Sequence, residues 1–164
     1  MKHLFFILLF ILSHQSFGQV QSRSYSDMLY KLLDHSVDEI NVSEASELGE
    51  STLFLDAREK KEYDVSHING AKWVGYDNFK MKRMSGVPKN KEIVIYCSVG
   101  YRSEKIAERL EKSGYTNVKN LYGSIFEWVN QGHPVYTNSG KKTMKVHAYD
   151  KEWGQWLRKG QKVY

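Results

Sequence analysis

The chain is poor in the residues and motifs that most often announce a structural or functional class. It contains 164 residues but only two prolines and a single cysteine, Cys97. One thiol excludes an internal disulfide and also the paired cysteines of a structural zinc site. There are no paired histidines at metal-ligand spacing and no GxxxxGK or GxGxxG run. Neither a metal site nor a nucleotide-phosphate loop is therefore predicted.

Long apolar runs are also missing, and the longest one lies near the start. Nine apolar residues at 4–12 follow a basic start, Met1-Lys2-His3, and precede small residues at Ser16 and Gly18. Nine is too few for a bilayer-spanning helix, which takes about 20 residues. This order is typical of a secretory signal peptide. We therefore expect residues 1–18 to be removed and the protein to be exported, to a bacterial periplasm; a buried N-terminal strand or helix is the alternative.

The expected export of the protein makes a functional role of the lone cysteine more important to consider. The 146 residues that remain after removal of 1–18 are enough for one domain with a substantial core. A single free thiol is unusual in an exported protein, where oxidants are common. Catalysis is the simplest reason for keeping Cys97.

Short apolar segments alternate with helical patterns along most of the chain. Residues 92–96 are predicted to be the central strand, and their unbroken apolar run Ile93-Val94-Ile95-Tyr96 indicates burial on both faces. Strands that alternate with helices predict an α/β fold with a central parallel sheet of about five strands. Ligands of such sheets bind at the carboxyl ends of the strands. The expected strands are 40–42, 53–55, 71–74, 92–96 and 118–121, and the expected helices are 24–35, 43–48, 60–65, 103–113 and 124–131.

Cys97 stands directly after strand 92–96, at the start of a short loop that leads into a helix. Gly100 lets the backbone turn with its N–H groups facing inward, and the helix N-terminus adds the positive end of its dipole. Together with the fixed charge of Arg102, these groups favour the thiolate, which is the nucleophilic form. The pattern Cys-x-x-Gly-x-Arg predicts a covalent-catalysis site for an anionic substrate. The alternative is a small buried core residue.

Three segments, in this order, resemble the single-domain rhodaneses. Their first signature is similar to Leu55-Asp56-Ala57-Arg58, Glu62-Tyr63 and His67-Ile68-Asn69-Gly70-Ala71, and their active-site loop is similar to Tyr96 to Ser103. Leu121-Tyr122-Gly123 with Gly132-His133-Pro134-Val135 is similar to their closing segment. The resemblance covers residues 38–136. It implies a rhodanese-like domain with helices on both faces of the sheet and with no cofactor or metal.

The resemblance also implies a sulfurtransferase. Cys97 is expected to attack the outer sulfur of a sulfane donor such as thiosulfate, so that sulfite leaves and a persulfide remains. Cyanide or a thiol, for instance that of a thioredoxin-like protein, then accepts the sulfur; no nucleic acid partner is expected. The residues expected to hold the small sulfur-containing anion are Ser98, Val99, Gly100, Tyr101 and Ser103 through the loop, with Arg102 as its charged contact.

The length of the loop bears on the chemistry. Four residues lie between Cys97 and Arg102. Phosphatases of a related fold place five residues there, which makes a wider cradle. The shorter loop therefore favours sulfur over phosphate or arsenate as the transferred or reduced group.

Three further residues of the first signature receive roles. Arg58 has two interpretations: it contacts the donor over the pocket, or it forms a structural ion pair. Asp56 is predicted to be structural support that holds Arg58 or Arg102. His67 is predicted to be a packing histidine rather than a base, since thiolate transfer needs none. Tyr101 either walls the pocket or faces solvent.

Two positions depart from the family pattern. Ser66 and Ser124 stand where the family commonly has glycine. Both lie outside the thiol loop, so we expect them to affect local turns rather than chemistry.

Two segments lie outside the resemblance, a helical segment at 19–37 and an extension at 137–164. The extension carries seven Lys and Arg against two acids, a net charge of +5. Its tryptophans predict a helix around 151–159 that packs back onto the domain; the alternative is a basic platform for a partner. That alternative supports a second functional hypothesis, a rhodanese-fold persulfide carrier or protein-docking module without turnover.

Overall fold

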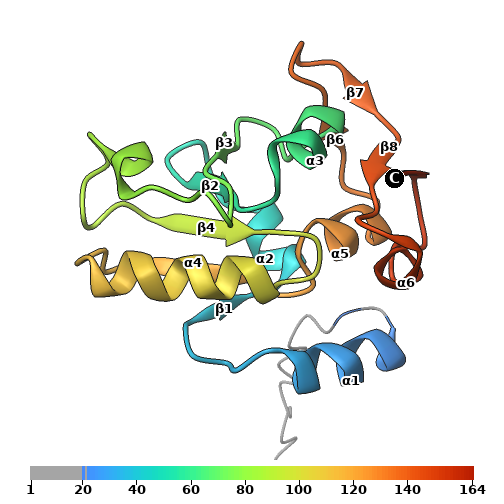
Figure 1. Cartoon of the computed structure of the whole chain (residues 1–164), viewed down its shortest axis with the longest axis horizontal. Coiled ribbons are helices and arrows are strands. Elements are labelled where there is room, and N and C mark those ends of the chain that lie inside the picture. The colour runs from blue at the N-terminus through green and yellow to red at the C-terminus, as the bar shows by residue number, and fades with distance from the viewer. Residues whose placement is uncertain (1–19, 21) are drawn as a thin grey trace, which may run out of the picture.

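A computed structural model describes residue 20 and residues 22–164. The predicted signal peptide, residues 1–18, lies outside the described residues. The centre of the molecule is a five-stranded sheet (Figure 1). Its strands are β1 (Glu39–Ile40), β2 (Leu53–Asp56), β3 (Lys72–Trp73), β4 (Ile93–Tyr96) and β5 (Val118–Leu121).

The sheet is parallel throughout, and β4 is its central strand. The strand order is β1-β5-β4-β2-β3, so β4 pairs with β2 on one side and β5 on the other. All four residues of β4 are buried. Ile93 and Ile95 belong to one apolar cluster, whereas Val94 and Tyr96 belong to another, as the two-residue period of a strand requires. The unbroken apolar run therefore serves two cores, one on each face, as predicted.

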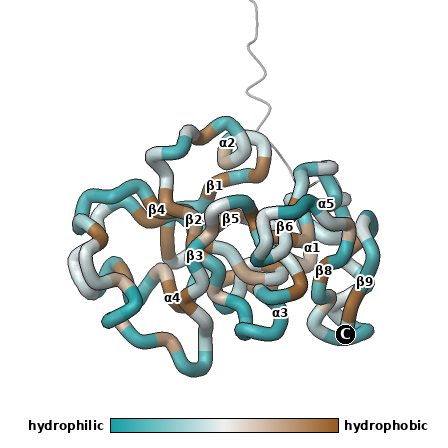
Figure 2. Tube along the Cα trace, turned by 90° about the horizontal axis from the view of Figure 1, so that it is seen from above, coloured by the Kyte–Doolittle hydropathy of each residue, from teal (hydrophilic) through white to brown (hydrophobic). Residues whose placement is uncertain are grey.

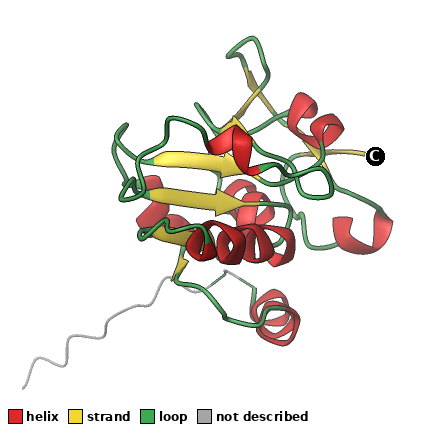
Figure 3. Cartoon of the chain, turned by 60° about the vertical axis from the view of Figure 1, so that its left-hand side comes forward, coloured by secondary structure: helices red, strands yellow, loops and turns green. Residues whose placement is uncertain are grey.

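Helices cover both faces of the sheet (Figure 3). The helix α4 (Tyr101–Lys112) packs on the face of Ile93 and Ile95 through Ile106, Ala107 and Leu110. Buried residues of α2 (Val42–Ser46) and α5 (Ser124–Asn130) belong to the cluster on the other face. Apolar stretches lie inside the molecule and hydrophilic stretches on the outer loops (Figure 2). The expected α/β architecture is confirmed.

Several helix boundaries differ from the prediction by one to three residues. The helix after the thiol begins at Tyr101, two residues before the expected start, because Gly100 already acts as its N-cap. The helix expected at 24–35 is α1 (Arg23–Leu32), which ends in extended backbone at Leu33. The remaining short elements are α3 (Lys60–Val65) and the 3-10 helix η1 (Met81–Met84).

The N-terminal segment is fixed to the domain by polar contacts as well as packing. The Tyr25 hydroxyl donates to the Gly123 carbonyl at 2.9 Å. The buried carboxylate of Glu104, on α4, accepts from the backbone N–H groups of Asp34 and Ser36 at 3.1 and 3.0 Å. α1 is therefore held beside the carboxyl edge of the sheet, close to the thiol loop.

The C-terminal extension folds as part of the same body. β6 (Val135–Tyr136) pairs antiparallel with β7 (Lys142–Thr143), and β8 (Lys145–His147) pairs parallel with β9 (Gln161–Val163). The expected helix at 151–159 is only α6 (Lys151–Gly154), because the chain must turn back at Gly160 to form β9.

The extension nevertheless packs onto the domain as predicted. Leu157 is fully buried in the core cluster, and the ring of Trp156 stacks on Tyr25 with centroids 5.3 Å apart. The side-chain amide of Asn130, at the end of α5, donates to the Trp156 carbonyl and accepts from the Arg158 N–H. Within the described residues, no helix combines the length and the apolar character that crossing a membrane requires.

Candidate active site

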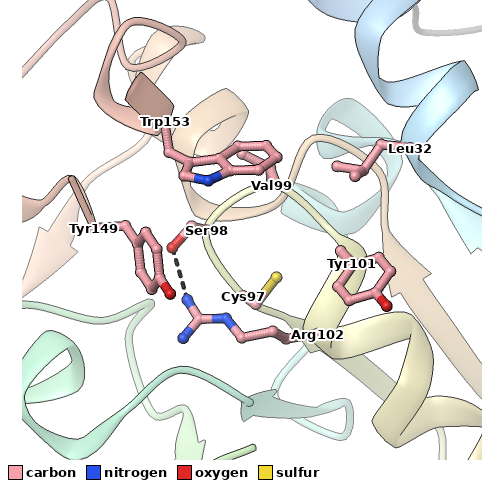
Figure 4. Close-up of a pocket in the computed structure, with 8 residues that line it drawn as sticks. All are labelled: Leu32, Cys97, Ser98, Val99, Tyr101, Arg102, Tyr149 and Trp153. Atoms are coloured by element: carbon pink, nitrogen blue, oxygen red, sulfur yellow. Dashed lines mark hydrogen bonds between the residues drawn. The ribbon is translucent and has the colours of Figure 1, made fainter. Parts of the chain in front are cut away.

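Cys97 lies at the carboxyl end of β4, where the chain turns into α4. Its side chain is 1% exposed and points into a pocket between the loop, α1 and α6 (Figure 4). The backbone N–H of Gly100 donates to the Cys97 sulfur at 3.1 Å. Gly100 has φ of 128°, a conformation that side chains oppose, so glycine here lets the N–H face the thiol.

The surroundings of Cys97 favour its thiolate. Burial raises the pKa of the thiol, but the charge of Arg102 and the N–H groups of Ser103 and Gly100 outweigh it. The net result is a pKa below the ordinary value. A buried thiol without such partners shifts in the opposite direction, and this contrast distinguishes Cys97 from a packing cysteine.

Arg102 is not a free cation, because the carboxylate of Glu62 binds it; Glu62 belongs to the first signature but was given no role from the sequence. The two terminal nitrogens of Arg102 donate to the two oxygens of Glu62 at 2.7 and 2.8 Å. The Glu62 side chain is fully buried and that of Arg102 is 14% exposed. Burial raises the pKa of Glu62, but the hydrogen bond and charge of Arg102 lower it to about 2.

Ser98 forms hydrogen bonds with both members of the Glu62–Arg102 pair. Its hydroxyl donates to the Glu62 carboxylate at 3.2 Å. The same hydroxyl oxygen accepts from Arg102 at 2.9 Å (Figure 4). The side chain of Ser98 is thus engaged in positioning the arginine, and its backbone remains part of the loop around the thiol. Val99 and Tyr101 line the pocket, with the Tyr101 residue 41% exposed. Ser103 is buried, and its hydroxyl bonds Gly100 and Asn120.

The structure replaces the expected donor contact of Arg58 with its structural alternative. Arg58 is fully buried, does not line the pocket, and bonds Asp56 with separations down to 2.6 Å. It also donates to the Ser66 carbonyl. Of the two partners expected for Asp56, the structure shows Arg58. The direct partner of Arg102 is Glu62 instead.

His67 has the surroundings of a packing histidine. Its ring stacks on Tyr63 with centroids 4.0 Å apart, and its Nδ1 lies 3.1 Å from the Tyr63 carbonyl. It is buried and is not among the residues that line the pocket. The geometry thus gives it no position from which to act as a base.

One departure from the family pattern, Ser124, contacts the backbone of Cys97. The contacts of Ser124 extend beyond its local turn, because its hydroxyl accepts from the Cys97 backbone N–H at 3.0 Å. The same hydroxyl donates to the Leu121 carbonyl. Ser124 also has φ of 53°, a left-handed conformation that explains why glycine suits this position.

Residues from outside the expected domain complete the pocket. Leu32 from α1, and Tyr149 and Trp153 from the C-terminal extension, line it together with the thiol loop (Figure 4). The Tyr149 ring lies over the Arg102 guanidinium at 5.2 Å. The sequence held no local signal for these contacts, since they depend on where β8 and α6 pack. The cavity measures about 230 Å³.

This arrangement can stabilise a thiolate or a persulfide anion and admit a small ligand to it. No group of three or more histidine, cysteine, aspartate or glutamate side chains that could hold a metal ion occurs within residues 22–164. The chemistry that the site offers is nucleophilic attack by sulfur, assisted by N–H donors around the anion.

Comparison with solved structures gives the same fold. A Bacillus halodurans protein superposes with a TM-score of 0.57 at 23% identity, over 71% of this chain and 86% of that one. A rhodanese-like domain protein from Staphylococcus aureus superposes with a TM-score of 0.55 at 24% identity, over 62% of this chain and 99% of that one. Identities this low show the fold alone.

Sequence relatives and a family model agree with this fold. A tRNA uridine(34) hydroxylase of Erwinia tasmaniensis is 35% identical over 92 residues, 51% of this chain and 26% of its own. That of Photorhabdus laumondii is 37% identical over 93 residues, with the same coverage. The chain thus spans about a quarter of these relatives. The model of the rhodanese-like domain matches residues 41–131, more than half of the chain, and the chain therefore belongs to the rhodanese-like domain family.

Proposed function

We propose that the protein is a sulfurtransferase that passes a sulfane sulfur through a persulfide on Cys97. The observation that carries the proposal is the thiol itself. It lies in a pocket at the end of the central strand, receives a hydrogen bond from Gly100, and has a lowered pKa. A residue kept for packing alone needs neither the pocket nor these donors.

The proposed reaction has two half-reactions. The Cys97 thiolate attacks the outer sulfur of a donor such as thiosulfate, the donor's S–S bond breaks, and its electron pair leaves with sulfite. The persulfide anion on Cys97 then gives its outer sulfur to cyanide, which leaves as thiocyanate, or to an acceptor thiol. Charge and atoms balance in both steps, and neither needs a metal or a general base.

Loop N–H groups support the anionic states in this scheme. Gly100 already donates to the sulfur, and the twelve-residue helix α4 begins directly after it. Donors fixed before the reaction are typically worth about 2.7–4 kcal/mol each in an enclosed site. Arg102 contributes through its field on the thiol, while Glu62 limits the net charge that it offers to a substrate.

Thiocyanate formation with thiosulfate and cyanide tests the proposal, with Cys97→Ser as control. We expect double-reciprocal plots to be parallel, as two separate half-reactions require, and the control to be inactive. Absence of turnover together with a stable persulfide would favour the carrier or docking alternative. The relatives' hydroxylase activity is not carried over, because the match covers 26% of their length.

We also propose that the protein is exported. The proposal rests on the basic start and apolar run within residues 1–18. Expression of the full chain in a bacterium followed by cell fractionation tests it. A periplasmic product whose N-terminus is Gln19 supports export, and a cytoplasmic product that keeps Met1 contradicts it.

A further inference from the structure

The outer wall of the active-site pocket comes from the two segments that flank the family domain. Leu32 precedes the matched residues 41–131, and Tyr149 and Trp153 follow them. Figure 4 shows Tyr149 and Trp153 on one side of Cys97, with Leu32 and Tyr101 on the other. The thiol is therefore approached between apolar and aromatic side chains, of which Leu32, Tyr149 and Trp153 lie outside the rhodanese-like domain.

We call Tyr149 and Trp153 the aromatic wall of the pocket. Hydrogen bonds of the backbone hold both residues in place. Tyr149 has φ of 66°, a conformation that costs a non-glycine residue about 1–2 kcal/mol, and its N–H donates to the buried His147 ring at 3.1 Å. Asp150 accepts from the Trp153 N–H at 2.8 Å and so fixes the start of α6. Despite this fixed backbone, Tyr149 remains 48% exposed, which leaves its ring available to a ligand.

The positive charge at the pocket is partly neutralised. Both terminal nitrogens of Arg102 are engaged by Glu62, and its guanidinium is covered by the Tyr149 ring. No other lysine or arginine is among the lining residues in the described part of the chain. Anion binding is therefore left mainly to the loop N–H groups next to Cys97.

The size of the pocket also exceeds what a small inorganic anion fills. Its volume is about 230 Å³, whereas a water molecule takes roughly 30 Å³ in the liquid. Pockets for drug-sized ligands start at about 300 Å³, so the space fits a group of about one ring beside the reacting sulfur.

We propose that the extension residues Tyr149 and Trp153 make the site selective for sulfane-sulfur anions that carry an aromatic group. The inference rests on the proposed sulfur transfer and names its substrate class. The aromatic ring of the donor packs between Trp153, Tyr149 and Leu32, while its sulfane sulfur meets Cys97. Aromatic pairs contribute beyond the area that they bury, so the wall favours such a donor over thiosulfate.

The step with an aryl thiosulfonate is the same displacement as with thiosulfate. The Cys97 thiolate forms a bond to the terminal sulfur, and the bond between this sulfur and the sulfonyl sulfur breaks. The electron pair leaves with the aryl sulfinate, and the Cys97 persulfide anion remains. No oxidant, reductant or proton donor is required.

Benzenethiosulfonate and methanethiosulfonate are suitable probes, since they share the reacting group and differ in the ring. We define the phenyl-to-methyl ratio as kcat/KM for the phenyl donor divided by kcat/KM for the methyl donor. We expect this ratio to be larger than the corresponding ratio of the two donors' rate constants with a free thiol in solution. Trp153→Ala and Tyr149→Phe separate the wall from the chemistry. The first should lower the phenyl-to-methyl ratio about tenfold, and the second, which keeps the ring, should leave it nearly unchanged.

Trp156→Ala is the matched control, because Trp156 lies in the same extension but stacks on Tyr25 outside the pocket. A ratio taken on one preparation does not depend on the folded fraction, so partial unfolding of a variant does not imitate selectivity. A phenyl-to-methyl ratio equal to that of a free thiol, or one that Trp153→Ala leaves unchanged, overturns the inference. Failure to take sulfur from any donor, thiosulfate included, instead overturns the proposed function.

Discussion

At the scale of single residues, the site is governed by charges whose partners lie far away in the sequence. Arg102 acts on Cys97 from one side and is held by Glu62 from the other. The arginine thus lowers the pKa of the thiol without presenting an unpaired charge to the pocket. This balance explains how one site can favour a thiolate and still accept a donor with an apolar body.

The pKa of Cys97 gives the first prediction. Alkylation by iodoacetamide follows the thiolate, so its rate should rise with pH around a midpoint below the ordinary thiol value of about 8.5. Arg102→Gln removes a cause of the lowered pKa and should move this midpoint upward. Lys105→Gln, on the same helix but paired with Asp34 and Glu108, serves as the control. A midpoint that Arg102→Gln does not move contradicts the assignment.

The Glu62–Arg102 pair gives the second prediction. Glu62→Gln leaves a mostly buried arginine without its counter-charge and should lower the free energy of unfolding by about 3 kcal/mol at neutral pH. The same change at Glu92, whose pair with Lys119 is about 30% exposed, should cost roughly 0–1 kcal/mol. Equal costs for Glu62→Gln and Glu92→Gln, measured by urea unfolding, would refute this ranking.

The effect of Glu62 should also depend on pH with a defined sign. Its pKa is lowered in the folded state, from 4.5 to about 2, so the carboxylate stabilises the fold fully above about pH 4.5. This stability is lost as the pH falls through the folded value of about 2. The difference between wild type and Glu62→Gln should therefore shrink across that window.

Ser124 gives the third prediction, at the backbone of the nucleophile. Ser124→Ala removes the acceptor for the Cys97 N–H and keeps a side chain in a left-handed conformation, whereas Ser124→Gly removes the acceptor but relieves the conformation. The alanine variant should be less stable than the glycine variant by about 1 kcal/mol. Thermal melts of the two variants decide the point, and an alanine variant as stable as the glycine one rules out the conformational argument.

At the scale of elements, the bounds of helices and strands were predicted correctly where the local sequence pattern is strong. The helix at 60–65 and the strand at 118–121 have the expected bounds. The loop between β4 and α4 could be assigned because Cys97, Gly100 and Arg102 lie close together in the chain. Glu62 was part of the first signature, but its role could not be assigned, because its partner Arg102 comes from another element.

The C-terminal extension shows the same limit more strongly. Its tryptophans predicted packing, which the structure confirms, but a longer helix than α6 (Lys151–Gly154). The parallel strands β8 and β9 have little alternation of apolar and polar residues, so the sequence pattern did not predict them. This pairing, with the packing of α6, holds the segment that carries Tyr149 and Trp153, and a sequence pattern alone does not predict it.

The extension gives the fourth prediction, which concerns its packing as an element. Leu157 is fully buried in the core cluster, so Leu157→Ala should lower the free energy of unfolding by about 3 kcal/mol. Met144, in the same extension, is 66% exposed, and Met144→Ala should stay within about 0.5 kcal/mol. If both variants unfold like the wild type, the extension is a detachable appendage rather than part of the core.

At the scale of the whole molecule, a rhodanese-like domain and its two flanking segments form one site. The domain supplies Cys97, the N–H donors and the Glu62–Arg102 pair. The N-terminal segment supplies Leu32, and the C-terminal extension supplies Tyr149 and Trp153. The extension also carries a net charge of +5. On the proposed function, the reacting groups and the selective side chains therefore lie on different parts of the chain and can be changed separately.

The most direct test of this account is the intact mass of the purified protein before and after thiosulfate or benzenethiosulfonate, with Cys97→Ser in parallel. We predict a gain of one sulfur atom that cyanide reverses and that the serine variant lacks. A wild-type protein whose mass does not change with either donor, or a serine variant that gains sulfur equally, would contradict the account.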